Sequence, residues 1–206
     1  MSVYLITGLT FGFAAAVTPG PLLTYLISQT LNNGWRRTLP AIFSPLITDG
    51  PIAVLILLIL SRVPPSLVGY LQFAGGIFIL YLAYGAFKAW QTYDIKKPVP
   101  FHSTRQNVLK AALINWLNPN PYLGWSLVLG PLLLKGWREA PFNAIVLLLS
   151  FYGIMFVGMT AIIMLFHAAR NLGPKVNRVM IGLSAAALAC FGLYQWWSGM
   201  KAIWLN

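Results

Sequence analysis

Two Pro-x-Pro interruptions lie about 100 residues apart in a chain that is otherwise strongly apolar. They are Pro19-Gly20-Pro21, which follows Thr18, and Pro119-Asn120-Pro121, which follows Asn118. Proline inside a helix removes a backbone donor and its ring clashes with the preceding turn, so each interruption leaves backbone groups without helical partners. In lipid such groups are tolerated only where they face protein or a water-filled cavity. The two interruptions therefore predict two broken helices whose breaks face the interior of the molecule.

The composition places these breaks in a membrane protein. With 58% hydrophobic and 8% charged residues and a mean hydropathy of +0.73, the 206-residue chain cannot supply the surface of a soluble domain. Crossing a bilayer takes roughly 20 apolar residues, and six stretches qualify: residues 3–31, 39–61, 67–91, 108–134, 142–168 and 176–199. The apolar amino terminus lacks a basic start, so it is expected to be a retained span and not a signal peptide. The sequence thus predicts an all-α integral membrane protein with six transmembrane helices, the first and fourth broken.

An internal repeat divides the chain into two halves. Pro19 matches Pro119 at an offset of 100, Gly34-Trp35-Arg36 matches residues 136–138 at 102, and residues 84–90 resemble 191–197 at 107. Three spans per copy is an odd number, so the second copy must enter the membrane from the opposite side. The prediction is an inverted repeat, with a first half at 1–95, a cytoplasmic linker at 96–107 and a second half at 108–206. Paired breaks in such halves are typical of the substrate site of secondary transporters.

The basic residues give the expected orientation. There are 14 Lys and Arg against three acidic residues, a formal net charge of +11. Such a balance can indicate nucleic-acid binding, but the cations lie in short loops between apolar spans, where the preference of basic loops for the cytoplasm explains them better. Ten of them lie near the loops after the first, third and fifth spans. Both termini are therefore expected outside the cytoplasm, and no nucleic-acid partner is expected.

A resemblance to a known family rests on the two breaks together. The Thr18-Pro19-Gly20-Pro21 break, the Asn115-Trp116-Leu117-Asn118-Pro119 approach to the second break and six spans in about 200 residues resemble the LysE-type (lysine exporter and homoserine/threonine resistance) family of amino-acid efflux transporters. The resemblance implies export of amino acids or related small zwitterions through a bacterial-type inner membrane, driven by protons. Many members carry Lys after the second Asn-Pro pair, where this chain has Asn120, which leaves the substrate's identity open.

The residues at the breaks suit a zwitterionic substrate. An α-carboxylate can be held by unpaired amides at the start of a half-helix, for which residues 20–22 and 120–122 are the candidates. Thr18 and Asn118 can cap these starts or bind the substrate directly. The alternative is that the motifs only kink the helices for packing. The expected substrate-binding residues are Thr18, Pro19, Gly20, Pro21, Asn115, Asn118, Pro119, Asn120, Pro121 and Tyr122.

Asp49 is the only acidic residue inside an expected span, since Asp94 and Glu139 fall between spans. A carboxylate at that depth costs a few kcal/mol on insertion scales, so it is expected to face a cavity. It could bind a substrate ammonium, carry the coupling proton, or do both in alternation. The alternative is a carboxyl paired inside the bundle for packing or stability.

Other functional classes are less consistent with the residues present. His102 and His167 have no second ligand nearby in sequence, so neither a metal site nor a cofactor is expected. One mid-span acid and no mid-span histidine disfavour an intramembrane enzyme. Export of an inorganic or metal cation and a passive small-solute channel stay open as alternatives. Small membrane bundles often pair, so a homodimer is compatible with the sequence, although no residue pattern demonstrates one.

Overall fold

A computed structural model describes residues 1–58, 65–91, 103–170 and 173–204, and every element in these ranges is helical. The all-α fold predicted from the sequence is confirmed for this part of the chain. The helices are α1 (Ser2–Val17), α2 (Pro21–Asn33), α3 (Trp35–Thr38), the short 3-10 helix η1 (Leu39–Phe43), α4 (Ser44–Leu58), α5 (Pro65–Gln91), α6 (Thr104–Trp116), α7 (Pro119–Gly124), the π-helical turn η2 (Trp125–Leu129), α8 (Gly130–Glu139), α9 (Pro141–Arg170) and α10 (Pro174–Trp204).

Several helices are long and apolar enough to cross a membrane. Among the described residues four segments qualify alone: Trp35–Ile56, Gly69–Gln91, Pro141–Ala169 and Arg178–Ile203. α1 and α2 qualify only as a pair, bent by 57° at the Pro19 break, which corresponds to a broken span or a re-entrant loop. The broken first helix is therefore confirmed, and the chain has several membrane-spanning candidates, as expected of a multi-pass membrane protein.

The expected fourth span, 108–134, is not among these candidates in the described part of the chain. A second break does occur, because α6 ends at Trp116 and α7 begins at Pro119. α6 has only 13 residues, and Arg105, Asn107 and Lys110 are among them, so it is too short to qualify alone as a membrane-spanning helix. The count of six spans is thus not reproduced, and the six-span inverted repeat stays a prediction.

The expected linker, 96–107, lies largely outside the described residues, as do Asp94 and His102. Its last residues are helical, because α6 starts at Thr104 and not at residue 108. Ser103 Oγ accepts a hydrogen bond from the Gln106 backbone N–H at 3.2 Å, and Gln106 Oε1 accepts one from the Ser103 N–H at 3.0 Å. This reciprocal pair is a capping box, which fixes the start of the helix.

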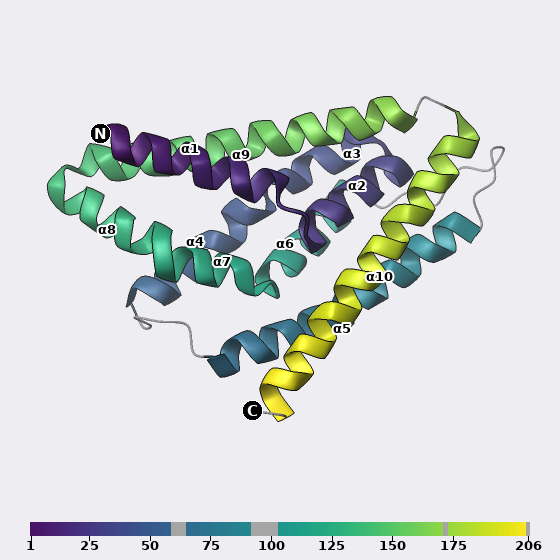
Figure 1. The fold of residues 1–206 in the computed structure, drawn as a ribbon. Coiled ribbons are helices and arrows are strands. Elements are labelled where there is room, and N and C mark those ends of the chain that lie inside the picture. Colours follow the sequence, from purple (N-terminus) through teal and green to yellow (C-terminus); the bar gives the residue numbers. More distant parts are fainter. Residues whose placement is uncertain (59–64, 92–102, 171–172, 205–206) are drawn as a thin grey trace.

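α1 and α9 lie side by side and run in the same direction (Figure 1). Gly8 packs against Leu147 and Ser150, and Gly12 packs against the backbone of Phe151, so that residue numbers rise together along both helices. A methyl group at either glycine would collide with these neighbours. Small residues allow such close backbone approach between membrane helices.

α5 and α10 form a second pair, which is antiparallel (Figure 1). Gly76 faces Trp196 and Gly182 faces Trp90, so numbers rise along one helix as they fall along the other. α2, α4, α6 and α7 lie between the two pairs in Figure 1. The broken segments therefore occupy the middle of the molecule.

The chain from α6 to α8 runs between the two ends of this bundle. Near the start of α6, Asn107 Nδ2 donates to the Arg37 carbonyl at 3.0 Å, just beyond the end of α2. At the last residue of α8, Glu139 Oε2 accepts a hydrogen bond from the Tyr4 hydroxyl at 2.8 Å, near the start of α1. The segment thus connects the end of the bundle marked by Arg37 with the end marked by Tyr4.

Candidate functional site

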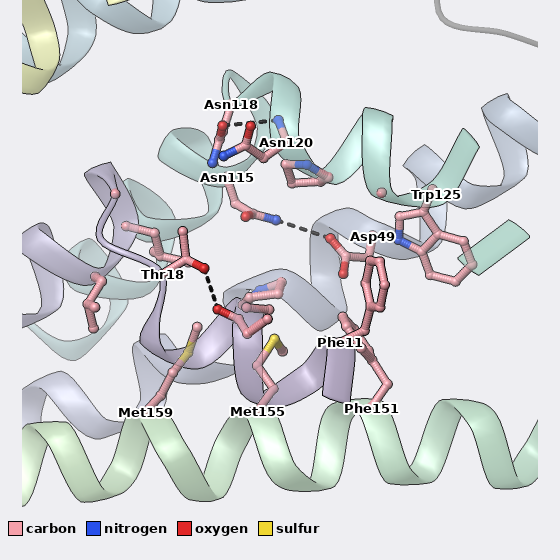
Figure 2. Close-up of a pocket in the computed structure, with 18 of the residues that line it drawn as sticks. Phe11, Thr18, Asp49, Asn115, Asn118, Asn120, Trp125, Phe151, Met155 and Met159 are labelled. Atoms are coloured by element: carbon pink, nitrogen blue, oxygen red, sulfur yellow. Dashed lines mark hydrogen bonds between the residues drawn. The ribbon is translucent and has the colours of Figure 1, made fainter. Parts of the chain in front are cut away.

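A cavity of about 280 Å³ lies where the two breaks meet. Both interruptions contribute to its lining, together with Asp49 from α4 and Asn115 from α6 (Figure 2). Eight of the residues selected from the sequence are therefore brought together: Thr18, Gly20, Pro21, Asp49, Asn115, Asn118, Asn120 and Pro121. The expectation that the two breaks face one interior space agrees with this arrangement.

Three of the expected residues do not line the cavity. Pro19 is exposed, whereas Pro119 and Tyr122 are buried in the protein. The Tyr122 hydroxyl donates a hydrogen bond to the Trp116 carbonyl at 3.0 Å, which ties α7 to the last turn of α6. Tyr122 thus stabilises the second break from outside the cavity. This is a packing role, in place of the expected contact with substrate.

At the first break, Thr18 closes the end of α1 and does not cap α2. Its backbone N–H and its hydroxyl both bond to the Ala14 carbonyl, at 2.9 and 2.5 Å (Figure 2). Gly20 is extended, with φ −169° and ψ 177°, and α2 begins at Pro21 without a side-chain cap. Proline suits this first position because the N–H it lacks would have no helical partner there. The first-turn amides of α2, next to the cavity, therefore have no side-chain acceptor at the cap position.

At the second break, Asn118 caps the helix that follows. Its Oδ1 accepts a hydrogen bond from the Asn120 backbone N–H at 3.1 Å (Figure 2). Of the two roles expected for these residues, capping is found for Asn118 and not for Thr18, for which direct substrate binding stays a prediction. One of the amides expected to be open to a carboxylate, that of Asn120, is already bonded.

Asp49 is almost completely buried, with 4% of its surface exposed, and side chains from two other helices bond to it. Oδ1 accepts a hydrogen bond from Asn115 Nδ2 on α6, and Oδ2 accepts one from the Tyr152 hydroxyl on α9, both at 3.1 Å. Asn115 Nδ2 also donates to Thr48 Oγ1 at 2.6 Å. Buried charge requires such partners. Because both donors are neutral, the carboxyl is oriented without losing its capacity to bind a cation or a proton.

Trp125 stands beside Asp49 and was not selected from the sequence. It begins the π-helical turn η2, in which Gly130 N–H bonds to the Trp125 carbonyl. Pro131 follows and has no N–H with which to continue the α-helical pattern, which favours such a turn. Trp125 is 4% exposed and lines the cavity. Its indole nitrogen faces Asp49 (Figure 2) but makes no hydrogen bond of normal geometry to a described residue.

The remaining lining is apolar and comes mostly from α1 and α9. Phe11, Phe151, Met155 and Met159 lie on the side of the cavity next to α9, across from the asparagines, and Asp49 lies between the two sides (Figure 2). No Lys, Arg or His is found among the described lining residues. The described ranges also contain no group of three or more His, Cys, Asp or Glu side chains placed to hold a metal ion. The cavity thus has one polar and one apolar wall.

Of the two residues next to Asp49 that the sequence analysis missed, Trp125 and Tyr152, only Trp125 could have been found from a sequence pattern. Asn118, Tyr122, Trp125 and Leu129 recur at helical spacing, so Trp125 could have been placed on the interior face with Asn118. Nothing local marks Tyr152 as the partner of Asp49, because the two residues are 103 positions apart.

Comparison with known proteins agrees with this architecture. The sequence model of the family described as LysE type translocator matches residues 13–198, which is most of the chain. No curated protein and no solved structure matches it. Translocators of this type are membrane transport proteins and not enzymes, which fits the apolar helices and the interior cavity. The chain therefore belongs to the LysE type translocator family, whose members move small solutes out across membranes.

Proposed function

We propose that this protein is a secondary active exporter of amino acids or related small zwitterionic metabolites and works by alternating access. The observation that carries the proposal is that both breaks and Asp49 line one and the same cavity. Its volume of about 280 Å³ lies just below the usual range for ligand pockets, roughly 300–1,000 Å³. A space of this size suits one small metabolite.

The two charges of a zwitterion have separate partners in this site. Asp49 is the only ionisable group among the described lining residues and takes the ammonium. The uncapped start of α2, beside Gly20 and Leu22, offers backbone amides and the favourable end of a 13-residue helix dipole to the carboxylate. The unpartnered indole N–H of Trp125 is a further donor in the same space. Asn115, Asn118 and Asn120 supply neutral hydrogen bonds, while Pro19, Pro119 and Tyr122 shape the breaks.

Proton coupling follows because the proton and the substrate ammonium compete for the same carboxyl group, that of Asp49. Asp49 cannot hold a proton and a substrate ammonium at the same oxygens, so the arrival of one favours release of the other. Tyr152 and Asn115 keep the carboxyl in place during this exchange. The proposed cycle is therefore antiport of protons against an exported zwitterion.

We further propose six crossings of a bacterial-type inner membrane, with both termini outside the cytoplasm. The halves are residues 1–95 and 108–206, inverted and joined by the cytoplasmic linker 96–107. The course of α6 to α8 between the Arg37 and Tyr4 ends of the bundle supports a further crossing. Alternate crossings also require α1 parallel to α9 and α5 antiparallel to α10, as is found. A homodimer, which the sequence allows, stays a prediction.

The decisive experiment is transport in proteoliposomes with a panel of labelled amino acids, comparing wild type with Asp49→Asn. Wild type should exchange substrate across the membrane, saturate and concentrate it when a pH gradient is imposed. Asp49→Asn should insert and fold but lose the gradient-driven accumulation. Glu139→Gln is the matched control, because it removes a carboxylate outside the cavity, and it should keep accumulation.

Three outcomes would overturn parts of this proposal. Normal accumulation by Asp49→Asn would remove the coupling role from Asp49. Unsaturable, downhill flux without exchange would indicate a channel. Transport of a metal cation with no exchange of any amino acid would indicate a cation exporter.

A further inference from the structure

One wall of the proposed substrate site is apolar and is formed by residues of α9 and α1. Phe151, Met155 and Met159 are spaced by four residues on α9, so they share one face, and each is at most 5% exposed. Phe11 on α1 adjoins them (Figure 2). Methionine side chains are flexible and polarisable and adapt to apolar groups of different shape. This wall, formed by these four residues, is the methionine wall.

The charges of the site leave no partner for a charged substrate side chain. If the proposed function is correct, the α-ammonium occupies Asp49, the only ionisable group among the described lining residues. A second ammonium, as in lysine, would then lie against the methionine wall without a counter-ion, and so would the second carboxylate of glutamate. An unpaired charge in an apolar environment is strongly unfavourable. A neutral amide side chain would also lose its hydrogen bonds with water there.

We propose that the methionine wall makes the cavity selective for amino acids with apolar, uncharged side chains, and that Met155 is a specificity-determining residue. This inference rests on the proposed function, since it assumes an amino acid held by its ammonium and carboxylate. It adds the chemical class of the side chain. Apolar side chains gain by leaving water for the wall, whereas charged and amide side chains do not.

Matched pairs of amino acids test the inference on the wild-type protein. Norleucine and lysine share an unbranched four-carbon side chain and differ by the terminal ammonium, and leucine and asparagine have similar shapes. In counterflow of labelled leucine in proteoliposomes, unlabelled norleucine and leucine should compete better than lysine and asparagine by about tenfold or more. Equal competition by norleucine and lysine would overturn the inference.

A substitution in the wall sharpens the test. Met155→Glu places a carboxylate where the substrate side chain is expected, so the ratio of lysine to norleucine competition should rise by about tenfold, as for an ion pair formed out of water. Met155→Leu keeps the wall apolar and should keep the wild-type order. An unchanged ratio in folded Met155→Glu would remove Met155 from selectivity. If that variant does not fold, the wild-type pairs decide.

The two levels of proposal fail in different ways. If no amino acid of any class exchanges in the wild type, the proposed function is wrong. If amino acids exchange but charged and apolar side chains compete alike, the exporter stands and only the role of the methionine wall is lost.

Discussion

The two breaks share a sequence pattern but satisfy their backbones differently. At the first, Thr18 bonds back to the Ala14 carbonyl, and α2 starts without a side-chain cap. At the second, Asn118 bonds forward to the Asn120 amide, and Tyr122 ties the turn to the Trp116 carbonyl. The first break is open toward the cavity, whereas the second is closed by its own hydrogen bonds.

The two breaks therefore have different roles, although the sequence repeat suggested that they were equivalent. Unpaired backbone amides at the start of a helix can bind an anion. In a capped start, one of these amides is already hydrogen-bonded to the capping side chain. We therefore assign carboxylate binding to the first break. At the second break, the Tyr122 hydrogen bond ties α7 to the end of α6, the helix that carries Asn115 next to Asp49. Substitutions can test this division of roles.

The largest effect is expected from Gly12→Leu, because the first break is held from outside by the contact of α1 with α9. A side chain at Gly12 would collide with the backbone of Phe151, and overpacking of this kind costs about 3 kcal/mol or more when backbone must move. The variant should show a large loss of folded, monodisperse protein in detergent. Gly153→Leu is the control, because nothing lies within 4 Å of a Cβ there. Equal yields would show that the α1–α9 contact does not hold the first break.

The next effect is expected from Gly20→Asn, which gives α2 the cap that Asn118 gives α7. The new side chain should occupy an amide proposed to bind the substrate carboxylate, raising KM for transport by about tenfold. Stability should rise by only a few tenths of a kcal/mol. Gly20→Ala is the control, since a methyl fits the extended backbone without accepting a hydrogen bond. An unchanged KM in Gly20→Asn would contradict the proposal that the uncapped amides of α2 bind the substrate carboxylate.

A smaller effect is expected from Asn118→Ala, which removes the cap of α7. Loss of an N-cap lowers the free energy of unfolding by about 1 kcal/mol, measurable as a lower midpoint in thermal unfolding. Thr18→Val should lower it less, because the Thr18 backbone N–H already bonds to the same Ala14 carbonyl. A larger loss from Thr18→Val would reverse the comparison.

The smallest effect is expected from Tyr122→Phe, which removes one hydrogen bond behind the second break. The free energy of unfolding should fall by about 0.5 kcal/mol, with KM unchanged because Tyr122 does not line the cavity. Thermal unfolding and transport assays on the same preparation measure both quantities. A KM raised as far as that of Gly20→Asn would place Tyr122 in contact with the substrate.

The sequence predicted the first broken helix and an Asp49 that faces a cavity, because proline geometry and the cost of a buried carboxylate act locally. It did not predict the different caps. Threonine carries its hydroxyl donor on a short branched side chain that bonds back to the preceding turn, whereas the longer asparagine side chain presents a carbonyl that reaches forward. Nor did it predict Tyr152 as a partner of Asp49, which depends on where the fold places α9 relative to α4.

The expected fourth span marks another limit. The apolar stretch 108–134 was expected to form one span, although it covers most of α6 together with α7 and part of α8. The polar residues of α6 make contacts inside the bundle, as Asn107 and Asn115 do. Hydropathy alone cannot distinguish such a buried polar helix from one outside the membrane, because it does not register protein neighbours.

The antiparallel pair of α5 and α10 supplies none of the described lining residues of the cavity. Its glycine-to-tryptophan contacts at Gly76 and Gly182 are internal to the pair. Changes there should alter how much protein accumulates in the cell and how well it withstands heat, while leaving the choice of cargo untouched. Relatives could therefore differ along this pair, outside its glycine contacts, and still carry the same solute.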